Sequence, residues 1–464
     1  MLANKPILYI ARIVIETSTP LSISAERGNG IFDTLLVRDA NELPTIPGSS
    51  FAGVLRSLYQ TSYGKELTQE LFGYSDKKDS EQISFVQTSW GCIHNSQNQP
   101  IEGLEKNPDK LKQDNILADA LQTIPVVRNH VRLNHKGTTK DQGKFDRTSL
   151  RKGHRFTIEL SLWSDNPQDK RWDNLLALLN RPDFRLGGAT RRGLGALKII
   201  RILERQFNLK NPKDFAEYNS NNFSLELGNT KGFTQKKLPK NKQFPQAKLS
   251  ITPQNGYRFG QGTEAFGVNE ADLLPISEKI IEWEKNQGKL SEKRRLVIPA
   301  SAVKGALSHR IAFHYNALTK YFADTISEEE LQNYDKERNE AVKGIFGFLK
   351  DNKNGQRGHL LLDDLYVENP IKALKVQHNS LDRFTGAARE HMLFNEEIIT
   401  QNTPLKLTIT LTNSFEPKVR QALAMTLDDL IKGRLALGGG SGRGGYGYFQ
   451  GELEWSDNGT WIKG

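Results

Sequence analysis

The chain contains almost no cysteine, since Cys92 is the single cysteine among 464 residues. One thiol excludes a disulfide within the chain and a zinc site built from several cysteines. No apolar run reaches the roughly 18 residues of a membrane-spanning helix. The sequence also lacks a phosphate-binding P-loop, a Ser–His–Asp arrangement and a cluster of zinc ligands. These absences exclude several common classes of hydrolase, metalloprotein and membrane protein.

The amino-terminal stretch MLANKPILYIARIVIE lacks the basic start and cleavable apolar segment of a signal peptide, and it predicts a β-strand instead. We therefore expect a cytoplasmic protein. Lys and Arg total 64 against 54 Asp and Glu, which gives a net charge of +10. This surplus favours a polyanionic partner, nucleic acid first, although a basic surface can also serve solubility alone.

Two glycine-rich stretches resemble each other. Residues 186–195 read LGGATRRGLG and residues 437–447 read LGGGSGRGGYG, with their first leucines 251 residues apart. Arg192 in the first stretch corresponds to Arg443 in the second. So much glycine indicates either a flexible linker or a loop whose backbone lies close to another group.

Two further pairs follow the same order. PGSSFAGVLRSL begins at Pro47 and PASAVKGALSHR begins at Pro299, 252 residues later, and each precedes a similar closing signal, LFGY and IFGF. A looser pair joins 131–145 to 379–394, where Phe145 and Phe394 each follow a glycine by eight residues. Three matched landmarks indicate a duplicated domain. We expect domains at 1–205 and 246–464, joined by a basic linker at 206–245.

The predicted elements have the same order in both copies: strand, helix, strands, helix, glycine loop and strand. This is the split βαβ pattern of ferredoxin-like, RRM-like domains. We predict an α+β protein with two such domains in tandem, each with insertions. Ser49 or Ser50, and Ser301 in the second copy, are expected to cap the first helix. Gly53 and Gly305 inside these helices predict either close packing on the sheet or approach of a phosphate to the backbone.

These motifs resemble the RAMP superfamily of CRISPR–Cas proteins, and most closely the Cas seven-type backbone subunits of type III effector complexes. The residues that carry the likeness are FDTLLVRDANELPTIPGSSFAGVLRSL, LFG and RLGGATRRGLG in the first copy, and VIPASAVKGAL, IFG, LDRFTGAARE and LGGGSGRGGYGYF in the second. The likeness spans both halves but not 75–125, 205–245 or 320–340. It implies a fused double backbone subunit that binds guide RNA and target RNA beside other effector subunits.

The resemblance also implies that one aspartate upstream of the Pro-Gly-Ser-Ser helix cleaves target RNA. Asp33 matches that position, and Asp39 is a rival that the family uses structurally. In the second copy Asp272 matches best, with Glu264 and Glu270 as lesser candidates. Asp272 lies 27 residues before its proline, whereas Asp33 lies 14 before its own. One carboxylate can hold hydrated Mg²⁺ or another divalent cation weakly, which helps to deprotonate a ribose 2′-OH.

We expect RNA to be held mainly through its backbone, by loop N–H groups and by arginines beside them. The alternative for each glycine loop is a tight helix-to-strand turn without a ligand. The predicted RNA contacts are Ser49, Ser50, Arg56, His130, Arg132, Gly187, Gly188, Arg191 and Arg192 in the first copy, and Ser301, Lys304, His378, Arg383, Gly438, Gly439 and Arg443 in the second.

Three functions stay open on the sequence. The first is a guide-RNA-binding backbone subunit that cleaves target RNA with a divalent cation. The second is a scaffold without catalysis, which Asp33 distinguishes from the first. The third is a metal-independent CRISPR RNA-processing endoribonuclease that uses His130, His135 or His378 for acid–base catalysis. Sensitivity to a chelator separates the third function from the first.

Overall fold

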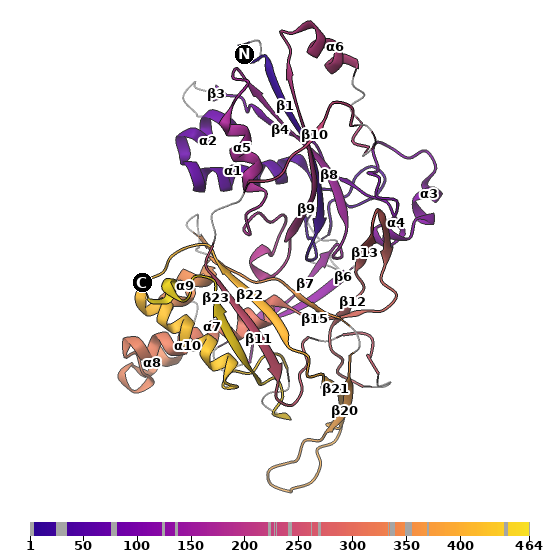
Figure 1. Cartoon of the computed structure of the whole chain (residues 1–464). Helices are drawn as coiled ribbons and strands as arrows, with labels where there is room; N and C mark the ends of the chain where they lie inside the picture. The colour runs from indigo at the N-terminus through magenta and orange to yellow at the C-terminus, as the bar shows by residue number, and fades with distance from the viewer. Residues whose placement is uncertain are drawn as a thin grey trace.

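Two domains lie one above the other in the computed structural model of the chain (Figure 1). The structure describes residues 4–24, 35–75, 81–122, 126–134, 138–220, 224–226, 228, 230–239, 244–260, 262–267, 271–332, 334, 339–348, 355–368, 371–439 and 444–463. Asp33, His135, Glu270 and Arg443 lie outside these residues. No described helix is both long enough and apolar enough to cross a membrane.

The first domain is built on an antiparallel sheet with the strand order β10-β9-β1-β8-β4, in which β10 is Thr234–Gln235. Its chain order is β1, α1, β4, β8, α5 and β9, so the sheet is the split βαβ arrangement that the sequence predicts. The bounds are β1 Ile7–Thr17, α1 Gly48–Tyr63, α2 Lys65–Phe72, β2 Tyr74–Ser75, β3 Glu81–Gln82, β4 Val86–Thr88, β5 Cys92–Ile93, α3 Pro108–Gln113, α4 Asn115–Ala120, β6 Val126–Leu133, β7 Thr139–Ser149, β8 Arg155–Ser164, α5 Lys170–Leu178 and β9 Leu197–Asn208.

The second domain repeats this arrangement. Its strands have the order β18-β22-β11-β23 in the sheet. Along the chain its elements follow one another as β11, α7, β18, β22, α10 and β23. The prediction of two ferredoxin-like domains is therefore confirmed. The bounds are β11 Gln246–Pro253, β12 Ser277–Glu278, β13 Ile281–Glu284, β14 Gln287–Leu290, β15 Arg295–Ile298, α7 Ala300–Thr319, α8 Glu328–Gln332, α9 Glu340–Phe346, β16 Gly347–Phe348, β17 Gln356–Arg357, β18 Leu360–Leu361, β19 Leu365–Val367, β20 Ala373–His378, β21 Phe394–Ile399, β22 Leu405–Leu411, α10 Pro417–Ile431, β23 Phe449–Trp455 and α12 Thr460–Lys463.

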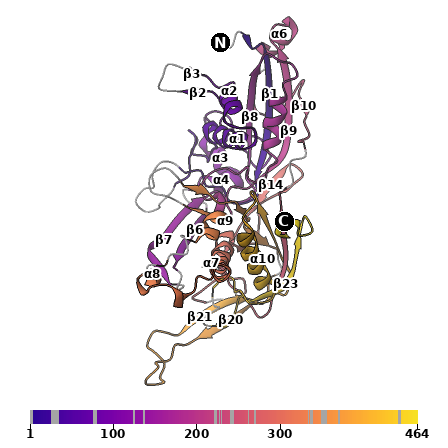
Figure 2. The ribbon, with the colours of Figure 1, turned by 90° about the vertical axis from the view of Figure 1, so that its left-hand side faces the viewer.

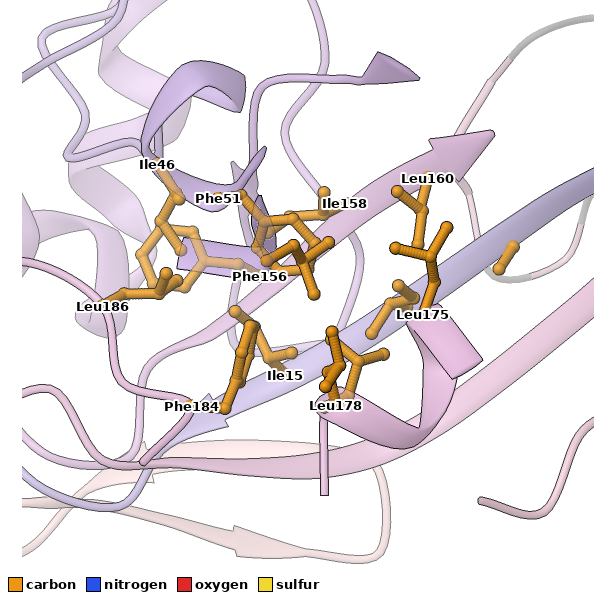
Figure 3. Close-up of a cluster of buried hydrophobic side chains, with 14 of the residues drawn as sticks. Ile15, Ile46, Phe51, Phe156, Ile158, Leu160, Leu175, Leu178, Phe184 and Leu186 are labelled. Atoms are coloured by element: carbon orange, nitrogen blue, oxygen red, sulfur yellow. The ribbon is translucent and has the colours of Figure 1, made fainter. Parts of the chain in front are cut away.

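Helices cover one face of each sheet because alternate strand residues are apolar. On β1, Ile13 and Ile15 point to the same face, and both are fully buried. Phe51 of α1 and Leu175 of α5 close over the same core, as Figure 3 shows for the labelled cluster. This burial fixes where the turn before each helix and the loop after it lie, and those segments carry most of the predicted site.

The segment 206–245 is more than the basic linker that the sequence predicts. Its first residues continue β9, and α6 (Pro212–Ser220) packs beside that strand. Further along, β10 (Thr234–Gln235) adds to the edge of the first sheet. Phe207 is fully buried on the outer face of this sheet with Leu8 and Ile10. Apolar residues among the lysines therefore anchor most of this segment to the first domain.

Two long hairpins leave the sheets in corresponding places. Hairpin β6–β7 leaves the first domain and runs beside the second, and hairpin β20–β21 leaves the second domain and projects from the end of the molecule (Figures 1 and 2). A third hairpin, β13–β14, returns from the second domain to the first, where Trp283 Nε1 donates to Gly153 O at 2.7 Å. These insertions hold the two domains together.

Candidate nucleic-acid interface

Each glycine loop folds against the segment that follows the first strand of its own domain. Gly188 N–H donates to Ser22 O at 2.7 Å, and Gly439 N–H donates to Arg258 O at 2.8 Å. The two loops thus form equivalent backbone hydrogen bonds, as expected if the two domains arose by duplication. These two amides are used inside the protein, so they are not the ones that would approach a phosphate.

Four glycines of the loops are required by the turn itself. Gly187 and Gly438 have φ values of +79° and +83°, and Gly195 and Gly447 have φ values of +72° and +84°. A side chain on any of them would collide with a backbone carbonyl. The tight helix-to-strand turn that the sequence offers as an alternative accounts for these four positions. It leaves the arginines between them to be explained.

A histidine lies flat on a phenylalanine in each long hairpin. His130 and Phe145 are opposite one another in β6 and β7, with ring centroids 5.0 Å apart and planes at 16°. His378 and Phe394 repeat this in β20 and β21, with centroids 5.0 Å apart and planes at 24°. The loosest of the three sequence landmarks is therefore a true structural repeat.

Arg192 joins the first glycine loop to the first hairpin. Its guanidinium carbon lies 4.9 Å from the centre of the Phe145 ring. The Phe145 ring therefore contacts both a cation, Arg192, and the ring of His130. Burial, and then Arg192, Arg128 and Arg147, lower the pKa of His130 to about 4. His130 is consequently neutral near pH 7. With that pKa it is unprotonated near pH 7 and therefore cannot serve as an acid, and it is only a weak proton acceptor.

In the second hairpin the histidine lies beside one carboxylate, that of Glu396. His378 Nε2 lies 3.0 Å from Glu396 Oε2, and Glu396 also pairs with Arg258, the residue that holds the second glycine loop. Asp272 is exposed, and its Oδ2 accepts the N–H of Asn395 at 2.7 Å. Asn395 follows Phe394 directly. The structure therefore brings the predicted residues Asp272, His378 and Gly439 to one end of the second domain.

Asp39 has a structural role. Its Oδ1 accepts the N–H groups of Asn41 at 2.8 Å and Leu43 at 2.9 Å, which closes the turn before α1. This agrees with the expectation for the rival of Asp33. The catalytic role of Asp33 itself stays a prediction.

Counted along the sequence from a shared backbone hydrogen bond, Asp272 corresponds to Asp33. Val37 N–H donates to Ile23 O, and Ile276 N–H donates to Phe259 O, at the same point of each fold. Asp33 is four residues before the first donor, and Asp272 is four residues before the second. The longer spacing to Pro299 arises downstream, where β13 and β14 are inserted between β12 and β15. The insertion therefore does not displace Asp272 from the matching position.

A metal ion at Asp272 stays a prediction. No three His, Cys, Asp or Glu side chains of the described residues converge as metal ligands. A hydrated divalent cation fits one exposed carboxylate because such an ion keeps most of its waters. Glu264, a lesser candidate, pairs instead with Arg294 at 2.6 Å.

The predicted serine caps are wrong. Helix α1 begins after Pro47 and helix α7 after Pro299, and neither start has a side-chain cap of its own. Ser49, Ser50 and Ser301 lie within the first turns, because proline ends the preceding extended chain. In the second domain the N–H of Ala300 is bound by Asp364 Oδ1 at 2.8 Å, from another part of the chain.

Close packing does not explain the helical glycines. A Cβ built on Gly53 or Gly305 would meet nothing within 4 Å. Both residues therefore border open space at the same place on α1 and α7. Of the two sequence interpretations, the packing of helix on sheet fails, and the approach of an external group to the helix backbone stays a prediction.

Lys304 lies in the joint between the domains. It is 7% exposed, and its Nζ donates to Leu360 O at 2.8 Å and to Arg191 O in the first glycine loop. Burial and then Arg191 lower its pKa to about 7. Arg191 Nε in turn donates to Gly358 O at 2.6 Å. Both residues were predicted to contact RNA, and the structure places them in domain-to-domain contacts instead.

The remaining predicted arginines are exposed. Arg132 lies on β6, Arg383 lies between β20 and β21, and Arg56 lies on α1, where it donates to Gly73 O at 3.1 Å. Arg128 is a structural residue that the sequence analysis did not single out. It is buried between the domains with Glu278 and Asp364. Its partners lie 150 and 236 residues away in the sequence, so no local pattern indicates its role.

Comparison with known proteins identifies the family. The RAMP superfamily model matches residues 14–198 and 289–450, which is one match for each domain. The chain belongs to the RAMP superfamily. A solved structure described as the type III-B Cmr-beta complex bound to cognate target RNA contains a chain similar to this RAMP protein. The identity is 15% and the TM-score 0.28, over 44% of this chain and 62% of that chain. A search of curated proteins gave no match.

Proposed function

We propose that this RAMP protein is a double backbone subunit of a type III CRISPR effector complex, which binds guide RNA along both domains and cleaves paired target RNA. The observation that supports this most is the repetition of one constellation in both domains. Each has a glycine loop fixed to the segment after the first strand, a His–Phe pair on a hairpin and an aspartate at one matched position in the sequence. Two such sites in one chain fit a regularly repeating ligand such as a paired RNA.

RNA binding in this proposal depends on charge and on backbone contacts. The net charge of +10 and the exposed arginines on the hairpins provide the positive charge that attracts phosphates. Affinity should fall with salt, with a log–log slope of about −0.7 for each phosphate contacted on a single strand. A flat salt response contradicts the proposal.

Cleavage in this proposal uses Asp33 and Asp272. A hydrated divalent cation, when bound, supplies positive charge at the scissile phosphate. The N–H of Asn395 donates to Oδ2 of Asp272 and so orients the carboxylate. In this proposal Oδ1 is the oxygen that contacts the hydrated cation. The role of this chain is then to fix a carboxylate beside a hairpin that borders the RNA.

The test is target-RNA cleavage by the assembled complex carrying Asp33→Ala, Asp272→Ala or both. If each aspartate serves its own site, each single variant loses one product and keeps the other, because distant sites act additively. Asp165→Ala, an exposed carboxylate of the first domain far from both sites in sequence, is the matched control. Loss of all products in Asp33→Ala alone would make the second domain a scaffold.

The scaffold and the processing nuclease are tested with the same variants. If neither aspartate affects cleavage, the chain binds RNA without catalysis. Activity that survives EDTA and is lost in His130→Ala or His378→Ala would favour the metal-independent nuclease. His130, neutral near pH 7, would act in that case only as a weak proton acceptor.

A further inference from the structure

A cavity of about 340 Å³ lies between the two domains, on the face of the first sheet that the helices do not cover. Glu16 lines it, and because this residue follows the buried Ile15 on β1, its side chain points away from the helices. Lys198 of β9 and Arg155 of β8 lie directly opposite Glu16 in the sheet and share its face. Strands β13, β15 and β19 of the second domain close the other side.

The arginines of this cavity are already balanced by carboxylates. Glu16 Oε2 accepts a hydrogen bond from Arg155 Nε at 2.9 Å, and Glu282 Oε1 accepts one from Arg295 Nη2 at 2.6 Å. Glu368, the third carboxylate of the lining, is exposed to solvent. The two ion pairs therefore fix the walls, and the remaining positive charge of the cavity belongs to two lysines, of which Glu368 offsets at most one.

Lys152 is the partly buried cation of the cavity. Its Nζ lies 4.7 Å from the centre of the Tyr366 ring. An ammonium carries three donors, yet no oxygen of the described residues accepts a hydrogen bond from this Nζ. Burial lowers the pKa of Lys152, because the charge is less well hydrated there. Lys198, exposed on the adjoining wall, also has no carboxylate partner among the described residues. An anion placed between the two lysines would satisfy both.

Two aromatic rings line the same cavity, and both are fixed in place. The Trp283 ring has the Arg155 guanidinium carbon 4.0 Å from its centre, and its Nε1 donates to Gly153 O at 2.7 Å. The Tyr366 hydroxyl donates to Glu278 Oε2 at 2.7 Å. A planar ligand ring therefore gains contact with these side chains without the entropic cost of ordering them.

We propose that this cavity binds a small phosphorylated ligand with an aromatic ring, of the size of a nucleoside monophosphate. The phosphate lies between Lys152 and Lys198, and the ring lies against Trp283 and Tyr366. The volume is near the lower limit of the roughly 300–1,000 Å³ of small-ligand cavities, so it matches one nucleotide rather than a paired RNA.

The cavity should occur once in each chain. Hairpin β13–β14 closes it, and this hairpin is inserted between β12 and β15 of the second domain. The described residues of the first domain have no hairpin between β1 and α1. The candidate RNA contacts, by contrast, are repeated in both domains. A stoichiometry of one ligand per chain therefore distinguishes this cavity from the repeated sites.

Isothermal titration calorimetry of the purified full chain freed of RNA tests this, with AMP, adenosine and inorganic phosphate as probes. AMP should bind at one site per chain with a dissociation constant below about 1 mM. It should bind more tightly than adenosine or phosphate, because only AMP contacts both the lysines and the rings. Lys152→Met should weaken AMP binding about ten- to a hundredfold, since a partly buried charged donor is lost. Lys198→Ala should weaken it about threefold, because that lysine is exposed.

The matched control is Lys248→Met, which changes an exposed lysine on β11 of the second sheet. It should bind AMP like the parent protein, and thermal melting verifies that each variant is folded. A repeat with saturating single-stranded RNA separates a free ligand from an RNA phosphate, since AMP should still bind. Failure of the RNA-binding proposal leaves the titration without RNA unaffected.

Three results overturn the proposal. The first is no AMP binding up to about 5 mM. The second is equal AMP affinity in Lys152→Met and the parent protein. The third is displacement of AMP by single-stranded RNA, which would assign the two lysines to the RNA backbone.

Discussion

The ring of His130 lies on that of Phe145 with centroids 5.0 Å apart, and Arg192 lies over the same phenylalanine at 4.9 Å. Three parts of the sequence therefore meet at one aromatic ring: β6, β7 and the first glycine loop. Phe145 is the residue through which loop and hairpin are held in a common orientation. The second domain repeats the pair as His378 and Phe394.

Phe145→Ala should weaken RNA binding, because Arg192 loses the ring that positions its guanidinium. A cation–π contact contributes about 0.5–2 kcal/mol, so we expect the dissociation constant to rise roughly two- to thirtyfold. Fluorescence anisotropy with a single-stranded RNA measures it. Phe145→Tyr keeps the ring and should bind like the parent. Equal affinity for Phe145→Ala and the parent would separate this ring from RNA binding.

Arg128→Met should strongly destabilise the contact between the domains. It leaves Glu278 and Asp364 buried with no guanidinium, and removal of one partner from a buried ionic cluster costs about 3–5 kcal/mol. Urea unfolding should show the loss. Combining it with Glu278→Gln and Asp364→Asn should recover most of the stability, because the uncompensated charges are gone. An unchanged midpoint in Arg128→Met would contradict the burial of this cluster.

Glycine substitutions should have opposite effects at two kinds of site. Gly195→Ala should cost about 3 kcal/mol or more, since its φ is +72° and a side chain meets the Leu186 carbonyl. Gly53→Ala should stabilise α1 by about 0.5–1 kcal/mol, because the site is open and helical. Thermal unfolding measures both.

Gly53→Ala should also reduce RNA affinity, about threefold, if a phosphate approaches the α1 backbone there. Ser57→Ala, an exposed change in the same helix, is the matched control. Unchanged RNA affinity in Gly53→Ala would mean that the open space beside the glycine serves another partner.

Stability should fall with acid, and His154 should account for part of the slope. This residue is fully buried, and neither ring nitrogen has a hydrogen-bond partner among the described residues. Burial, and then Arg151, lower its pKa to about 3. Between pH 6.5 and about 3 the unfolded chain binds a proton that the folded chain does not, so stability declines as pH falls, by up to about 1.4 kcal/mol per unit.

His154→Leu should reduce the slope of the unfolding free energy against pH, because one proton fewer is bound on unfolding. Denaturant unfolding at pH 6, 5 and 4 measures this slope. His94 and His130, whose pKa values are both lowered to about 4, should maintain the rest of the slope. An unchanged slope in His154→Leu would mean that its ring is protonated in the folded protein.

The sequence by itself determined the duplication, the ferredoxin-like order of elements and the approximate place of each loop. Local patterns suffice for these features: apolar alternation in β1, the helical stripe after Pro47 and glycine where φ is positive. The resemblance in the residues before Pro47 was enough to select Asp33 and Asp272 as candidates. The element order, the loop positions and the choice of candidate aspartates do not depend on contacts between distant segments.

Only the tertiary structure decided which basic residues face outward. Lys304 and Arg191 look like RNA contacts in sequence, yet both are held between the domains. Arg128 gave no sign of its role because Glu278 and Asp364 lie 150 and 236 residues away. From the sequence alone, a basic residue is expected to lie at the surface unless its ion-pair partner is known. For such long-range pairs, the partner is set by how two folded domains pack rather than by any local pattern.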